Sequence, residues 1–128
     1  MWIDAGRLAR ALTCLLLLAS APAHAPARVA IIRANAINWE DEQIAIMIRV
    51  EPDARNRWLI VAAMEGGVAV RVSLEQLDGE DAAITRWLRW SSLPAGEFLI
   101  VAALKESGPH DVARAVWPMK ILARGPEP

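Results

Sequence analysis

The segment of residues 43–50 constrains the fold more than any other part of the sequence. β-branched residues stand at every second position, and Gln43, Ala45, Met47 and Arg49 lie between them: Ile44, Ile46, Ile48 and Val50. Successive side chains of a β-strand point to opposite faces, so this alternation predicts a strand with one face in a hydrophobic core and the other exposed. A single strand leaves backbone donors and acceptors unpaired, so the chain must supply partner strands.

Six further segments have the composition of strands, and turn signals separate them. We expect strands at residues 29–33, 58–64, 68–73, 84–90, 98–104 and 112–122. Gly66-Gly67 favours a tight hairpin between two of them, and Pro118, which has no backbone donor, indicates an edge strand or a bulge. A helical turn fits only near residues 74–77. Together with residues 43–50, the pattern predicts an all-β, seven-stranded antiparallel β-sandwich formed by residues 28–128.

The first 27 residues have a different composition. Arg7 and Arg10 precede an apolar run at residues 11–21, and small residues and prolines follow it. This arrangement is typical of a secretory signal peptide, with cleavage possible after Ala23, Ala25 or Ala27. The run is about half of the roughly 20 residues needed to cross a bilayer, which makes a retained membrane anchor the weaker interpretation. We therefore expect an exported protein, periplasmic or extracellular, with no transmembrane segment in the mature chain.

Composition limits what residues 28–128 can be. The whole chain has 128 residues, of which 55% are hydrophobic, 14 are basic and 15 are acidic. This length suits one domain, and the balanced charge gives no reason to expect a nucleic-acid partner. Cys14, the one cysteine, lies in the apolar run, so no disulfide can form within the chain. We expect the hydrophobic core to hold the domain together.

The sequence Leu-Pro-Ala-Gly-Glu-Phe at residues 93–98 resembles the corner that leads into strand F of immunoglobulin-like and fibronectin type III-like domains. In these families a tyrosine stands where this chain has Phe98, so the resemblance implies the packing role but not the hydroxyl hydrogen bond. It also implies that Trp58 matches the core tryptophan of strand C. The chain is similar to small exported bacterial domains of this class without an assigned activity, which implies a binding or structural role.

Side chains typical of catalysis are scarce. His24 and His110 are the two histidines, and no serine lies in a G-x-S-x-G motif. We therefore expect a protein that is not an enzyme and needs no cofactor. The alternative is a copper-binding protein. Cleavage after Ala23 would expose the amine and imidazole of His24, which together with His110 and Asp111 would suit Cu(II). A β-sandwich with such a site resembles the periplasmic copper-resistance chaperones, which are small immunoglobulin-like domains with an N-terminal histidine.

The tryptophans offer a second alternative, a carbohydrate-binding module. The chain has six tryptophans, and exposed rings can stack on sugars. Trp87 and Trp90 are three residues apart, so on one strand they point to opposite faces and cannot form one platform. At least one of them is expected in the core.

Residues 58–64 and 98–104 are apolar at every position, so both faces of these two strands are apolar whichever face is buried. The resemblance places the two strands side by side in one sheet. We expect their outward faces to merge and to contact a protein partner or another copy of the chain, centred on Leu59, Val61, Leu99 and Val101. The alternative is that the N-terminal strand or the segment 74–77 covers this face.

Overall fold

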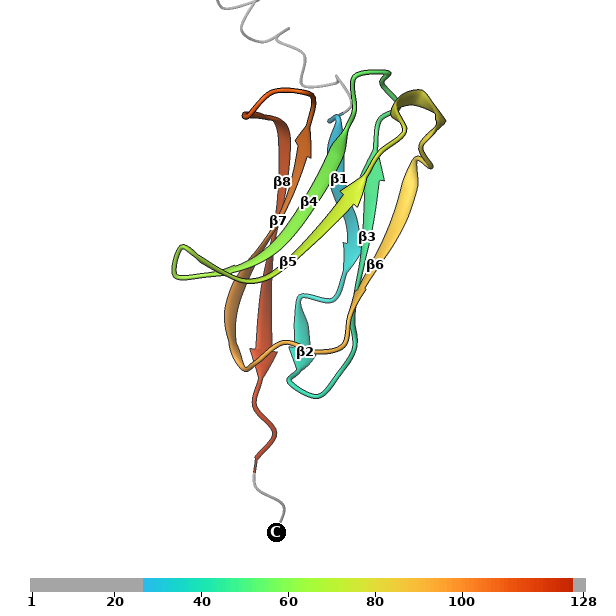
Figure 1. The fold of residues 1–128 in the computed structure, drawn as a ribbon. Coiled ribbons are helices and arrows are strands. Elements are labelled where there is room, and N and C mark those ends of the chain that lie inside the picture. The colour runs from blue at the N-terminus through green and yellow to red at the C-terminus, as the bar shows by residue number, and fades with distance from the viewer. Residues whose placement is uncertain (1–26, 126–128) are drawn as a thin grey trace, which may run out of the picture.

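The computed structural model describes residues 27–125 and consists of two β-sheets packed face to face (Figure 1). One sheet has three strands in the order β1 (Val29–Ala34), β3 (Ile44–Val50) and β6 (Thr85–Trp90). The other has five strands in the order β2 (Ile37–Trp39), β8 (Asp111–Leu122), β7 (Gly96–Lys105), β4 (Trp58–Glu65) and β5 (Val68–Gln76). The predicted all-β, two-sheet architecture is confirmed.

All seven predicted strands are present, with ends that differ from the prediction by no more than three residues. The predicted number is nevertheless too low for the described part of the chain, because β2 is an additional strand. It pairs in parallel with β8, whereas every other strand pair is antiparallel. The helical turn expected at residues 74–77 is wrong as well: β5 continues to Gln76, and a 3-10 turn follows at Gly79–Asp81.

The hydrophobic core lies between the two sheets and is built around β3. The alternating side chains of this central strand are almost fully buried: Ile44, Ile46, Ile48 and Val50. Across the gap they meet the inward side chains of β4 and β7, including Leu59, Ile100 and Leu104. Each aliphatic side chain buried in this way contributes about 1.5–3 kcal/mol.

Two turns fix the course of β4 and β7. Gly66 and Gly67 have φ values of +56° and +81°, as a two-residue type I′ hairpin requires. This confirms the predicted hairpin, which joins β4 to β5 and extends beyond the body of the sandwich in Figure 1. At the start of β7, Gly96 has a φ of +154° and the Glu65 carboxylate lies against it, so a side chain there would be strained. Phe98 is buried just after this corner, as predicted.

Pro118 is tolerated because its nitrogen faces a free edge of β8. The Lys120 amide donates to the Ala36 carbonyl, on the side of β8 away from β7. Backbone groups two residues apart in a strand point the same way, so the nitrogen of Pro118 also faces away from β7. β2 pairs only with residues 120–122, so no ladder hydrogen bond is lost at Pro118. The predicted edge strand is thus confirmed only locally: β8 lies between β2 and β7, but it has no partner on the β2 side at Pro118.

Polar contacts close the open side of the sandwich between the edge strands β5 and β6. The Trp90 Nε1 group donates to Ser73 Oγ at 2.8 Å, and Arg71 donates to the Ser92 carbonyl at 3.0 Å. Arg86 of β6 forms an ion pair with Glu75 of β5. These contacts connect the two sheets where no disulfide is available to do so.

The predicted signal peptide lies outside the described residues, apart from Ala27. Within residues 27–125, no helix has the length and hydrophobicity needed to cross a membrane.

Replacing Ser73 by Ala should destabilise the sandwich by about 1–3 kcal/mol, because the buried Nε1 group of Trp90 loses its acceptor. Urea unfolding followed by tryptophan fluorescence measures this change. Ser91→Ala is the matched control: Ser91 is exposed one residue beyond β6 and should change stability by less than about 0.5 kcal/mol. Equal effects of the two substitutions would contradict a role for the hydrogen bond between the sheets.

Candidate interaction surface

The outward side of the five-stranded sheet carries a continuous set of apolar side chains. In the β4–β7 register Ile60 lies opposite Ala103 and Ala62 opposite Val101, and the pattern continues onto β5 and β8. We call this set the apolar face: Trp58, Ile60, Ala62, Met64, Val72, Leu74, Leu99, Val101, Ala103, Val116 and Pro118. The same side is charged at its two ends, with Glu97 and Lys120 at one end and Lys105 and Arg114 at the other.

The apolar face is hollowed along its middle. On β5, Val72 is 55% exposed and Leu74 is 61% exposed, and on β8 Val116 is 57% exposed. Between them, β4 and β7 present smaller or half-buried side chains, including Ala62 and Ala103, and leave a hollow of about 320 Å³. We call this the central hollow, and we call Val72 with Leu74 the β5 ridge.

Two of the four predicted interface residues do not lie on this surface. Leu59 and Val61 are each 2% exposed and point into the core, so their predicted outward orientation is wrong. Ile60 and Ala62 occupy the outward positions of β4 instead. The physical reason is that both faces of β4 are apolar, so its sequence does not indicate which face is buried.

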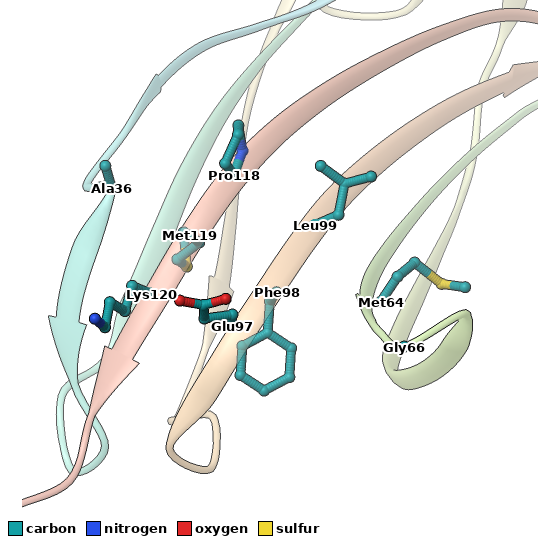
Figure 2. Close-up of a pocket in the computed structure, with 9 residues that line it drawn as sticks. All are labelled: Ala36, Met64, Gly66, Glu97, Phe98, Leu99, Pro118, Met119 and Lys120. Atoms are coloured by element: carbon teal, nitrogen blue, oxygen red, sulfur yellow. The ribbon is translucent and has the colours of Figure 1, made fainter.

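Leu99 and Val101 do point outward, as predicted, and Leu99 is 40% exposed. Figure 2 shows the Leu99 side chain and the Phe98 ring leaving β7 on opposite sides. No part of residues 27–125 covers the face in the way the alternative supposed: β1 belongs to the other sheet, and residues 74–76 continue β5 beside β4. A role of Leu99 and Val101 in binding remains a prediction.

A second hollow, of about 530 Å³, lies where the β4–β5 hairpin diverges from β7 (Figure 2). It is lined by Ala36, Met64, Gly66, Glu97, Phe98, Leu99, Pro118, Met119 and Lys120. Glu97 and Lys120 are its charged side chains and lie opposite each other in the β7–β8 register. Met64, Leu99 and Pro118 also belong to the apolar face, so this hollow extends the same surface.

A salt-bridge cluster bounds the other end of the central hollow. Asp111 accepts a hydrogen bond from Arg114 Nε at 2.6 Å and forms an ion pair with Lys105 Nζ at 3.1 Å. The hydrogen bond from Arg114, followed by that from Lys105, holds the pKa of Asp111 below its usual value of 3.8. With two cations and one carboxylate, this end of the hollow has a net positive charge.

The residues of the copper alternative are not brought together in the described chain. His24 lies outside the described residues, and His110 is exposed in the β7–β8 connection. The carboxylate of Asp111 already has two cationic partners. Within residues 27–125, no group of three or more His, Cys, Asp or Glu side chains is arranged to hold a metal ion.

The tryptophans are likewise dispersed. Trp90 is buried in the core and Trp87 is exposed on the outer side of the three-stranded sheet, which confirms that the two rings occupy opposite faces of β6. Trp58 also points outward, so its predicted match to a core tryptophan is wrong. Trp39 is on β2, where the Arg124 guanidinium lies 4.7 Å from its ring centroid. β7 and β8 separate β2 from β4, so Trp39 and Trp58 do not form one platform.

Comparison with known proteins assigns no family to the chain. No protein-family model matches the sequence, and a search of curated proteins finds no match. Function must therefore be inferred from the surface itself.

Leu59→Ala and Leu99→Ala form a matched pair that tests the orientation of β4 and β7. Leu59→Ala should cost about 2–5 kcal/mol of unfolding free energy, because it leaves a cavity in the core. Leu99→Ala should cost about 1 kcal/mol or less, because the side chain is partly exposed. Chemical denaturation of both variants measures the difference, and a similar loss in the two would contradict the assigned orientations.

Asp111→Asn should lower stability at pH 7 but not in strong acid. The folded-state pKa of Asp111 is lowered, so the carboxylate stabilises the fold above pH 3.8, and this stabilisation is lost as the pH falls through the folded-state pKa. Urea unfolding of the wild type and the variant between pH 7 and pH 2 should give two curves that converge at the acidic end. A stability difference independent of pH would show that Asp111 acts by packing rather than by charge.

Proposed function

We propose that residues 28–128 form an exported immunoglobulin-like (fibronectin type III-like) module that binds a protein, a partner or a second copy, through the apolar face and has no catalytic activity. The observation that carries this proposal is the apolar face, which extends over four neighbouring strands and has charged side chains only at its two ends. Export is supported by the signal-peptide pattern of residues 1–27.

The strand order supports the immunoglobulin-like part of the proposal. The sheet β1-β3-β6 and the strands β8-β7-β4-β5 follow the order in which strands A, B, E and strands G, F, C, C′ of such domains lie side by side. β4 and β7 then take the places of strands C and F, and the corner before Phe98 enters β7. Two features depart from the family pattern, since Trp58 points outward and Phe98 has no hydroxyl group.

The size of the apolar face supports a binding role. The face spans residues 58–64 on β4, 72–74 on β5, 99–103 on β7 and 116–118 on β8. With strands about 4.8 Å apart and a rise of about 3.4 Å per residue, these positions give roughly 300 Å² in projection. Soluble monomers rarely expose contiguous apolar patches larger than a few hundred Å², and the largest patch is often functional. Leaving this area in water costs free energy that a binding partner would recover.

The two alternative functions, copper binding and carbohydrate binding, have less support. Asp111 is engaged with Lys105 and Arg114, which disfavours the periplasmic copper-binding alternative. The separation of Trp39, Trp58 and Trp87 disfavours a carbohydrate-binding platform. Protein binding through the apolar face is the function that the geometry supports best.

Val101→Lys tests the proposal, because it places a charge at the centre of the apolar face. The wild-type protein, immobilised and exposed to an extract of the native cell envelope, should retain a protein that Val101→Lys does not retain. Met47→Lys is the matched control, since Met47 is also half-buried and outward-facing on a central strand, but of the three-stranded sheet.

Near-UV circular dichroism must show that both variants remain folded. The proposed function is overturned if neither retention of a protein nor self-association of the wild type differs between Val101→Lys and Met47→Lys.

A further inference from the structure

The central hollow has an apolar floor and one charged end. Ala62 and Ala103 form the floor, and the β5 ridge borders it on one side. Lys105 lies two residues beyond Ala103 on the same face of β7, and Arg114 lies opposite Ala103 on β8. The backbones of the two basic residues are thus about 5–7 Å from that of the alanine, so the apolar floor leads directly to positive charge.

The charged end has more hydrogen-bond donors than its own contacts use. Arg114 donates to Asp111 through Nε, and within residues 27–125 its two Nη groups donate to no other group. The Lys105 ammonium has three donors, of which the Pro109 carbonyl accepts one at 3.1 Å and Asp111 takes a second. The Arg114 side chain is 67% exposed, so a ligand can reach it. Two cations against one carboxylate, with unused donors, favour an anionic group.

The remainder of the hollow is apolar and has no backbone groups to offer. Its other lining residues are Ile60, Ala62, Met64, Val101 and Ala103. β4 and β7 are each paired on both sides, so their N–H and C=O groups are used within the sheet. A peptide main chain lying here would lose hydrogen bonds to water without gaining others, whereas an alkyl chain would only lose contact with water. The hollow therefore suits an alkyl chain better than a peptide main chain.

The size of the hollow also fits a small ligand. Its volume of about 320 Å³ falls at the lower end of the range of roughly 300–1,000 Å³ that small-molecule sites occupy. Because a ligand here would keep one side in water, we expect a dissociation constant of about a millimolar.

We propose that the central hollow binds a small aliphatic carboxylate, a short- or medium-chain fatty acid, with its carboxylate on Arg114 and Lys105 and its alkyl chain over Ala62 and Ala103. This site goes beyond the proposed function, because it takes a small ligand and needs no protein partner.

An NMR titration of the isotope-labelled protein with octanoate, below the concentration at which octanoate forms micelles, tests the site. The backbone amides of Ala62 and Ala103 should shift saturably, and those of β3 in the other sheet should not. Octyltrimethylammonium has the same alkyl chain and a positive head group, and it should bind at least about tenfold more weakly. Butanoate should also bind at least about tenfold more weakly, because its shorter chain buries less apolar area.

Substitutions at the two ends of β8 test where the carboxylate lies. Arg114→Gln should weaken octanoate binding at least about fivefold, because it removes a charge-assisted hydrogen bond. Lys120→Gln is the matched control: Lys120 is exposed on the same face of β8 but at the other hollow, so screening by salt should keep its effect below about twofold. The same NMR spectra show whether each variant is folded.

The absence of a saturable shift with octanoate overturns the proposal. Equal binding of octyltrimethylammonium overturns it too, because the hollow would then accept any apolar chain. Equal effects of Arg114→Gln and Lys120→Gln would place the carboxylate elsewhere and overturn the assigned site. Tighter binding of the acetylated tripeptide Leu-Ala-Leu than of octanoate overturns the fatty acid in favour of a protein carboxyl terminus. None of these outcomes decides the proposed function, which the retention experiment with Val101→Lys tests separately.

Discussion

The packing of β3 against β4 and β7 is the interaction on which the remainder of the structure depends. Ile44, Ile46 and Ile48 are almost completely buried, and they meet the inward side chains of the two central strands of the other sheet. With a single cysteine in the chain, no disulfide between the sheets can replace this contact. The burial of these side chains must therefore offset most of the conformational entropy lost when the strands form.

The outward side of the five-stranded sheet is unusual, because the core requires apolar side chains only on the inward side of each sheet. A sheet that is buried on one side needs only one apolar face, and its exposed face is normally polar. β3 and β6 follow this rule in part, with Arg49 and Arg89 on their outer sides. β4 and β7 do not follow it, since Ile60, Met64 and Val101 point away from the core. Core packing does not account for these outward side chains, and this is why we propose that they contact another protein.

Polar side chains at the edges and at one end of the sandwich connect its strands by hydrogen bonds and ion pairs. Between β5 and β6, the Trp90–Ser73 hydrogen bond and the Arg86–Glu75 ion pair connect the sheets, and they also direct charged side chains of an edge strand inward. At one end, the fully buried Asn56 accepts a hydrogen bond from Arg28 and donates one to the Glu51 carbonyl, which attaches the β3–β4 connection to the start of β1. The resulting distribution places polar edges and ends around an apolar face.

Local pattern alone was sufficient to predict seven strands, the Gly66-Gly67 hairpin and a side of Pro118 without a pairing strand. Alternation, turn residues and a missing donor are properties of the chain itself. It did not reveal β2, whose three residues form a strand only because Lys120 and Leu122 of β8 lie beside them. It also gave the wrong orientation for β4, because both faces of this strand are apolar. The flanking charges do not help, since Arg57 and Glu65 share the parity of the buried Leu59 and Val61. Glu65 lies at the hairpin, with its carboxylate against Gly96, and Arg57 precedes the strand, so neither charge marks the exposed face. Which side of a wholly apolar strand is buried depends on the sheet packed against it, and that packing exists only in the folded molecule.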